Sequence, residues 1–126
     1  MIFLDTSVLV DAITGRLETA RALNRVIEQG ERLAVSTLVL FEWLRGPRSA
    51  EQIELQQALV PLDRAVPFGA REAGTAAGLY RTVAHPRRRE IDLAIAATAI
   101  THDAALWTLD ASDFRDIPDL RLYTPR

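Results

Sequence analysis

The sequence predicts a three-layer α/β/α domain built on a central, mainly parallel sheet. Short apolar runs, such as Ile2–Leu4 and Ala105–Leu109, have the length and continuity of strands that are buried on both faces. Segments with apolar residues at helical spacing separate these runs along the chain. Strands that alternate with helices pair in parallel through right-handed crossovers, so helices are expected on both faces of the sheet.

Length and composition limit the kinds of protein this can be. The chain has 126 residues, 48% of them hydrophobic, so we expect a single domain over residues 1–126 with a substantial core. The absence of cysteine excludes a disulfide framework, a thiolate zinc site and a cysteine nucleophile. No apolar run approaches the roughly 20 residues of a membrane span, and the first residues lack the basic region of a signal peptide. We therefore expect a cytoplasmic protein without membrane association.

Capping residues indicate where helices begin in the first half of the chain. Thr6 or Ser7 is expected to cap a helix over Val8–Ile13, and Ser36 or Thr37 is expected to cap the helix after the second strand. Glycine or proline ends most of these helices. The expected elements are strand Ile2–Leu4, helix Val8–Ile13, helix Glu18–Gln29, strand Leu33–Ser36, helix Leu38–Arg45 and helix Ala50–Leu59.

Two helices of contrasting pattern are predicted in the second half. The segment Ala70–Val83 has one alanine-rich face, made of Ala73, Ala76, Ala77, Tyr80, Val83 and Ala84. Gly74 and Gly78 lie four apart on this helix and would let another backbone come close. Ile91–Thr101 is so rich in alanine and isoleucine that it should be buried nearly all round.

The remaining strands follow from shorter signals. Val66–Phe68 is either a short strand or a loop. Ala105–Leu109 is predicted to be a strand that Asp110 follows directly, and Leu120–Tyr123 is a plausible edge strand.

Four acids that are far apart in the sequence are expected to meet at one edge of the sheet. Asp5 and Asp110 each follow a strand, which puts both at the carboxyl edge where open α/β sheets bind ligands. Glu42 lies in the helix after the second strand, early enough to stay near that edge. Asp92 opens the helix that runs back into the Ala105–Leu109 strand, so its first turn lies at the same edge.

Each acid also has a structural explanation. Asp5 could end a strand and cap a helix, Asp92 could be a first-turn acid that the helix dipole favours, and Asp110 could form an Asx-turn. Glu42 lies in an otherwise apolar helix, where Arg45 at i+3 could pair with it. Because all four explanations would have to hold together, a shared metal site is favoured.

A cluster of acids needs protons or cations. Two carboxylates ~4 Å apart repel by roughly 4 kcal/mol at an effective dielectric constant near 20. Hard oxygen ligands without histidine or cysteine favour Mg²⁺ or Mn²⁺ over zinc. The natural chemistry of such a site is phosphoryl hydrolysis, because the metal lowers the pKa of a water and neutralises charge on the phosphate. Asp113 is a candidate fifth ligand or supporting group, whereas Asp116 is expected to be a solvated loop acid.

Four segments, in this order, resemble the successive motifs of PIN-domain proteins, and the chain length fits the VapC toxins of bacterial toxin–antitoxin pairs. They are Ile2–Ser7, Ser36–Glu42, Glu90–Ala99 and Leu106–Phe114. The resemblance implies a PIN fold and a Mg²⁺- or Mn²⁺-dependent endoribonuclease that hydrolyses RNA phosphodiester bonds. It also implies a cognate antitoxin that covers the active site, and commonly a homodimer.

The resemblance further implies site residues. The acids that match Asp5, Glu42, Asp92 and Asp110 form the metal centre of the family, and Thr6 and Thr108 match its hydroxyl positions. The fourth acid varies in the family between Asp and Asn, with an acid often three residues on. Both Asp110 and Asp113 are therefore candidates for it in this chain.

Three consecutive arginines, Arg87, Arg88 and Arg89, precede Asp92 and should border the acidic edge. The net charge of −2 gives no general attraction for RNA, so a local basic patch or a metal is needed. The arginines could supply a phosphate clamp that binds the substrate, provided that one of them points into the cleft. The alternative is a solvated loop.

Two alternative functions also fit a cluster of acids at strand ends. Receiver and haloacid-dehalogenase-like domains also gather acids at strand ends, but both normally need a lysine near the acids. The chain has no lysine, and its first strand has no Asp-x-Asp, so this class is set aside. A catalytically silent PIN domain that binds only RNA or a protein is the alternative; retention of all four acids argues against it.

Overall fold

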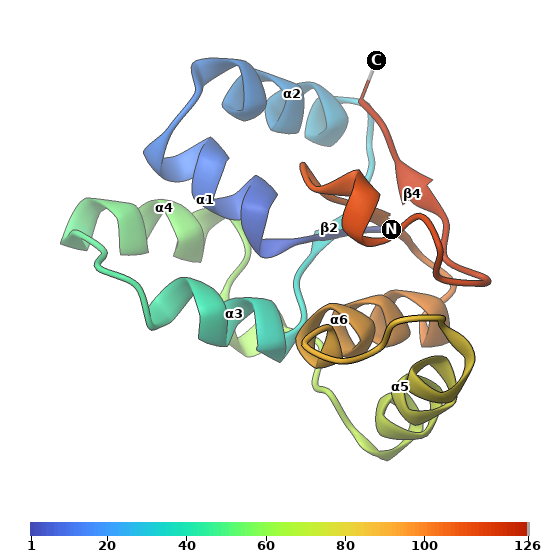
Figure 1. The fold of residues 1–126 in the computed structure, drawn as a ribbon. Coiled ribbons are helices and arrows are strands. Elements are labelled where there is room, and N and C mark those ends of the chain that lie inside the picture. Colours follow the sequence, from blue (N-terminus) through green and yellow to red (C-terminus); the bar gives the residue numbers. More distant parts are fainter. Residues whose placement is uncertain (126) are drawn as a thin grey trace.

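The computed structural model of the chain describes residues 1–125, and a parallel sheet lies at its centre (Figure 1). The strand order is β2-β1-β3-β4. The strands are β1 (Ile2–Leu4), β2 (Leu33–Ala34), β3 (Ala105–Trp107) and β4 (Leu122–Tyr123). Ile2 of β1 lies opposite Leu33 on one side and opposite Ala105 on the other, and every pairing is parallel. The predicted parallel sheet is therefore confirmed.

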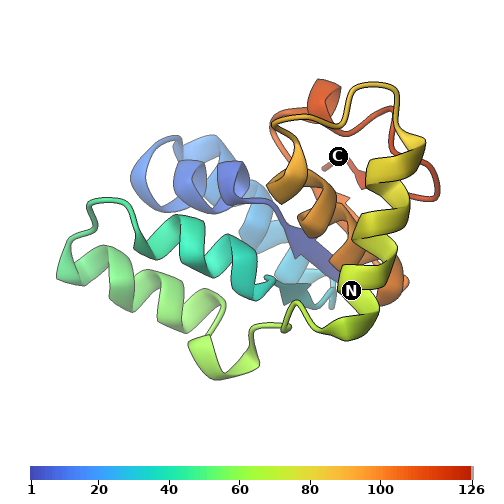
Figure 2. The same ribbon diagram turned by 60° about the horizontal axis from the view of Figure 1, so that its bottom comes forward.

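Helices cover both faces of the sheet, which confirms the three-layer α/β/α architecture. Figure 1 shows α1 and α2 on one side and α5 and α6 on the other, while Figure 2 shows α5 lying along α6. The helices are α1 (Thr6–Thr14), α2 (Leu17–Glu28), α3 (Thr37–Leu44), α4 (Ala50–Leu59), α5 (Ala70–Thr82) and α6 (Glu90–Thr101), with 3₁₀ turns η1 (Leu62–Arg64) and η2 (Ala111–Asp113). No helix in residues 1–125 combines the length and the apolar character needed to cross a bilayer.

The two predicted helix caps have different outcomes. Ser36 caps α3, because its hydroxyl accepts a hydrogen bond from the Val39 backbone N–H at 3.2 Å. The prediction for α1 is wrong, since that helix begins at Thr6 itself, after Asp5, and no side chain caps it. The Ser7 hydroxyl instead donates to the Asp5 carboxylate.

Helix α6 confirms its predicted burial. The seven residues from Leu93 to Ala99 are all buried, while Ile91 near its start stays 44% exposed. The tryptophans of α3 and β3, Trp43 and Trp107, also lie in the core. The alanine side chains of α6 are small, which allows this helix to pack closely against β3, α3 and α5.

The alanine-rich face predicted for α5 is wrong in part. Val83 is buried and Ala76 is half-buried, but Ala73 and Ala77 are exposed. A Cβ atom built on Gly74 would have no neighbour within 4 Å, and the same holds for Gly78, so no other backbone comes close to these glycines.

Helix α5 is instead joined to the end of α6 through Glu72, whose carboxylate accepts a hydrogen bond from the Thr101 hydroxyl and lies 3.0 Å from the His102 ring. Leu79 of α5 is buried.

Three strands are shorter than predicted: β2 ends at Ala34 rather than Ser36, β4 begins at Leu122 rather than Leu120, and β3 also ends early. The segment Val66–Phe68, predicted as either a strand or a loop, forms no strand of its own. Val66 forms only an isolated parallel bridge with Ser36. Strand β3 ends at Trp107, two residues before the predicted end, because serine and threonine hydroxyls bind the next backbone N–H groups. The Leu109 N–H donates to Ser7, and the Asp110 N–H donates to Thr108, each at 3.0 Å.

Candidate metal centre

A pocket of about 440 Å³ lies at the carboxyl edge of β1 and β3. The four predicted acids, Asp5, Glu42, Asp92 and Asp110, all contribute to its lining. The structure thus brings together side chains from the residue between β1 and α1, from α3, from α6 and from the segment after β3. Their role in metal binding stays a prediction.

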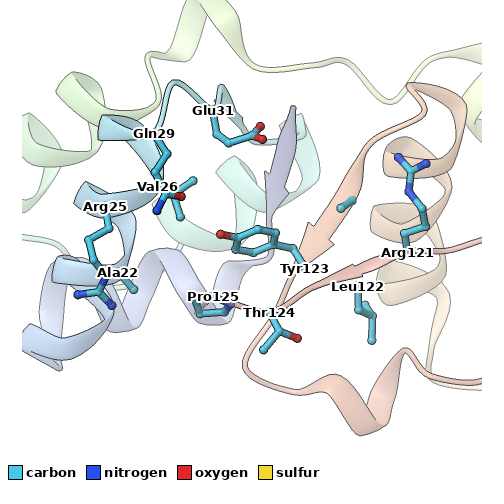
Figure 3. A pocket seen from close by; sticks show the side chains of 11 residues that line it. Ala22, Arg25, Val26, Gln29, Glu31, Arg121, Leu122, Tyr123, Thr124 and Pro125 are labelled. Carbon is cyan, nitrogen blue, oxygen red and sulfur yellow. The ribbon is translucent and has the colours of Figure 1, made fainter.

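A larger cavity of about 570 Å³ lies elsewhere, between α2 and β4 (Figure 3). Arg25 and Arg121 line it, and Glu31 is its acidic residue. Because none of the four predicted acids lines this cavity, the smaller acidic pocket is the candidate site.

Asp5 is the most buried of the four acids, with 6% of its surface exposed. Its Oδ2 atom accepts hydrogen bonds from the hydroxyls of Thr108, at 2.7 Å, and Ser7, at 3.0 Å. Burial raises the pKa of Asp5 above its ordinary value, while the hydrogen bonds from Thr108 and Ser7 oppose this rise. The hydroxyls thus favour the charged carboxylate at a site that burial would otherwise neutralise.

Glu42 is held by a residue from α1. The Thr6 hydroxyl donates to its Oε1 atom at 2.6 Å. Arg45, the expected partner one helical turn away, lies 3.6 Å from Oε2. Thr6 therefore connects the first turn of α1 to the acid on α3, and the ion pair is the longer of the two contacts.

Asp92 lies in the first turn of α6, and its pKa is raised to about 6. Burial is the largest cause, followed by the negative charges of Asp5, Asp113 and Glu42, while Arg89 acts in the opposite direction. The raised pKa shows that the acids act on one another through space. The pocket therefore has an excess of negative charge that a cation would relieve.

The two candidates for the fourth acid differ in placement. Asp110 lines the pocket, whereas Asp113 does not. Asp110 directly precedes the η2 turn, and Asp113 is the last residue of that turn. The negative charge of Asp113 contributes to the raised pKa of Asp92. Each candidate thus has one observation in its favour.

The three arginines lie outside the lining of the acidic pocket. Arg87 and Arg88 are exposed, as a solvent-facing loop would be. Arg89 pairs with both carboxylate oxygens of Asp116, at 2.6 and 2.8 Å. Asp116 is an exposed loop acid, as expected, but it also pairs with Arg89, which was not predicted. RNA binding by the arginines stays a prediction.

One acid in the pocket lining was not predicted from the sequence. Asp11 of α1 lines the pocket, and its Oδ2 accepts a 2.6 Å hydrogen bond from Thr19. Ser7, Val10 and Thr14 share this face of α1 at helical spacing. The spacing of four residues from Ser7 to Asp11 along the first helix was the signal that could have found Asp11.

The donor set has the chemistry of a hard divalent cation site, because it consists of carboxylate and hydroxyl oxygens. Within residues 1–125, no three acidic or histidine side chains lie close enough together to form a ready-made metal site. Even so, oxygen donors and unbalanced negative charge around Asp92 fit Mg²⁺ or Mn²⁺ better than zinc. The acids would have to draw closer together around such an ion.

Comparisons with known proteins agree with the fold. The PIN domain family profile matches residues 2–120. The chain is 37% identical over 123 residues to ribonuclease VapC19 of Mycobacterium tuberculosis, covering 96% of this chain and 98% of that protein. It is 29% identical to ribonuclease VapC of Rickettsia bellii, covering 98% and 95%. The crystal structure of VapBC2 from Rickettsia felis bound to promoter DNA has a similar fold, with a TM-score of 0.78, 23% identity and 98% of both chains covered.

Proposed function

Because this chain belongs to the PIN-domain family, we propose that it is the ribonuclease toxin of a toxin–antitoxin pair. The observation that carries the proposal is the acidic pocket, which gathers Asp5, Glu42 and Asp92 from three separate elements. The proposed reaction is endonucleolytic hydrolysis of RNA phosphodiester bonds. The similarity to proteins named ribonuclease VapC extends over almost the whole sequence.

The proposed cofactor is Mg²⁺ or Mn²⁺. Asp5, Glu42 and Asp92 would hold it, with Asp110 or Asp113 as the fourth acid. When bound, the ion would lower the pKa of a water and neutralise charge on the phosphate. What supports this is the all-oxygen donor set and the raised pKa of Asp92.

The chain's own hydroxyls prepare the acids for this role. Thr108 and Ser7 both donate to Oδ2 of Asp5, which leaves Oδ1 without a hydroxyl donor. Thr6 donates to Oε1 of Glu42. These hydrogen bonds hold each carboxylate in one orientation, which is how groups around a metal site orient its ligands.

The substrate is RNA whose bases are unstacked, as in loops and single strands, because these can enter an open cleft. The exposed guanidinium groups of Arg87 and Arg88 would bind its phosphates and offset the repulsion by the acids. In this arrangement Arg87 and Arg88 bind the phosphates, and hydrolysis takes place in the acidic pocket.

The proposed protein partner is a cognate antitoxin that covers the acidic pocket, and the toxin itself would form a homodimer. Support comes from the similar fold of a chain in the VapBC2 crystal structure. A partner that enters a pocket lined by five acids would need basic side chains. Such an assembly would act in the cytoplasm, where RNA is translated.

Cleavage of total RNA tests the proposal. Wild type and Asp92→Asn are compared with added Mg²⁺ or Mn²⁺ and with EDTA. Asp103→Asn, which makes the same chemical change just after the other end of α6, is the matched control. We expect wild type and Asp103→Asn to cleave RNA only with metal, and Asp92→Asn to lose at least ~100-fold in rate.

The alternative is a catalytically silent module that binds RNA or a protein. Folded, metal-loaded wild-type protein, freed of antitoxin, that cleaves no RNA in this assay would favour that alternative. Equal cleavage by wild type and Asp92→Asn would show that the acidic pocket is not the site of hydrolysis.

A further inference from the structure

The guanidinium group of Arg89 makes more contacts than any other arginine side chain described here in residues 1–125. Nη1 and Nη2 donate to the two carboxylate oxygens of Asp116, at 2.8 and 2.6 Å. Nη2 also donates to the backbone carbonyl of Asp113 at 3.0 Å, and Nη1 lies 3.5 Å from the carbonyl of His85. The side chain is 20% exposed, so it is largely covered by the groups that it binds.

These contacts join two segments that carry acids of the proposed metal centre. Arg89 is the residue directly before α6, and its carbonyl accepts the Leu93 N–H at 2.8 Å, so its backbone belongs to the first turn of the helix. Asp92 lies in that same turn. Asp113 and Asp116, to which the Arg89 guanidinium donates, lie in the segment after β3.

We infer that Arg89 is a positioning residue, whose pairing with Asp116 and with the Asp113 carbonyl sets how Asp113 lies relative to Asp92. The inference rests on the proposed function, since it concerns the metal affinity of that acidic pocket. It gives Arg89 a different role from Arg87 and Arg88, although the three are adjacent in sequence.

The contacts argue against a direct phosphate contact by Arg89. The four N–H groups of the two terminal nitrogens face Asp116 and two backbone carbonyls, so a phosphate at these nitrogens would have to displace one of these acceptors. The pair with Asp116 is bidentate, which is the strong geometry for guanidinium and carboxylate. The electrostatics agree with a link to the acids, because Asp116, Asp92 and Asp113 all help to raise the pKa of Arg89.

The segment that Arg89 binds has apolar anchors of its own. Phe114 and Ile117 are buried at 2% and 4% exposure, so this segment stays attached to the core without the ion pair. Loss of Arg89 is therefore expected to change the orientation of Asp113 while the fold remains. Interactions of this kind around metal ligands are typically worth 10- to 100-fold in metal affinity.

The test measures Mn²⁺ binding by calorimetry at pH 8, with the full chain and without RNA. We expect Arg89→Met and Asp116→Asn each to weaken Mn²⁺ binding on the order of 10-fold. The double variant should bind Mn²⁺ no more weakly than the weaker-binding single variant, because both substitutions break the same Arg89–Asp116 pair. Thermal unfolding of the metal-free variants should stay close to that of wild type.

The sign of the Arg89→Met effect separates positioning from simple electrostatics. Removing a positive charge near the pocket would by itself attract Mn²⁺ more strongly. Tighter or unchanged binding in Arg89→Met would therefore overturn the inference. Arg87→Met, which removes the neighbouring charge without breaking an ion pair found in residues 1–125, is the matched control and should not weaken binding.

A second measurement compares RNA binding in EDTA at several salt concentrations. A phosphate contact adds about 0.7 to the slope of log affinity against log salt for single strands. We expect this slope to fall in Arg87→Met and to stay unchanged in Arg89→Met. A reduced slope in Arg89→Met, together with wild-type Mn²⁺ affinity, would assign Arg89 to the substrate instead. Wild-type protein that binds no Mn²⁺ would overturn the metal centre itself and, with it, this inference.

Discussion

The hydroxyl of Thr108 lies 2.7 Å from the carboxylate of Asp5, although 103 positions separate the two residues in the sequence. Thr108 also accepts a hydrogen bond from the Asp110 backbone N–H. One threonine therefore orients a buried acid at the end of β1 and fixes the backbone that carries the next acid. Both acids line the same pocket.

Thr108→Val should shift the acid limb of the pH–rate profile to higher pH. The hydrogen bond from Thr108 lowers the pKa of Asp5, so its loss raises that pKa further and Asp5 becomes protonated at a higher pH. RNA cleavage by wild type and variant, measured from pH 5 to about 9, checks this. Thr108→Ser keeps the hydroxyl and should retain the wild-type profile; identical profiles for valine and wild type would contradict the prediction.

Asp92→Asn should stabilise the metal-free protein at pH 7.5. The pKa of Asp92 is raised to about 6 in the folded state from its ordinary value of 3.8, so the folded protein binds this proton more tightly than the unfolded chain. Wild type therefore loses stability as the pH rises from about 4 to 6, and Asn escapes that loss. We expect a gain of about 1–2 kcal/mol, discounted for partial exposure.

Urea unfolding of wild type and Asp92→Asn in EDTA measures this gain. The gain should be largest above pH 6 and should shrink as the pH is lowered towards 4. A variant that is less stable than wild type at pH 7.5 would show that Asp92 is not under electrostatic strain.

Mn²⁺ affinity should fall steeply below about pH 6. Because the pKa of Asp92 is raised to about 6, protons compete with the metal for this carboxylate as the pH falls through that value. We expect affinity to fall by up to about 10-fold per pH unit there. Calorimetry in buffers of different ionisation enthalpy measures both the Mn²⁺ affinity and the number of protons released. An affinity that does not change between pH 5 and pH 8 would exclude Asp92 as a ligand.

Asp113→Asn and Asp110→Asn should differ in their effect on Asp92. The negative charge of Asp113 helps to raise the pKa of Asp92, so Asp113→Asn should lower that pKa below about 6. Asp110→Asn should have the smaller effect. NMR titration of the Asp92 carboxyl carbon compares the two variants, and a larger shift in Asp110→Asn would reverse this order.

The sequence was sufficient for elements whose pattern reflects burial alone. Ile2–Leu4 and the buried run in α6 from Leu93 to Ala99 were predicted because apolar residues have few alternatives to the core. The alanine-rich face of α5 was misjudged, since alanine is small enough to be exposed at little cost. There, Glu72 is buried instead, paired with His102, which hydropathy does not reveal.

The acids of the candidate site could be named from the sequence, because each lies at an element end that the topology carries to one edge. Their partners could not. The hydrogen bond from Thr6 to Glu42 and the pairing of Arg89 with Asp116 depend on side-chain orientation between segments distant in sequence. Neither periodicity nor capping rules report such orientations.

The order of the strands has a consequence for synthesis on the ribosome. Strand β1 lies in the middle of the sheet, and one of its two neighbours, β3, begins only at Ala105. Until that strand and the residues after it have left the ribosome, Asp5 has Ser7 but lacks Thr108 as a hydrogen-bond donor, and the pocket lacks the wall formed by Leu109 and Asp110. For most of its synthesis, the nascent chain thus lacks residues that the complete acidic pocket requires.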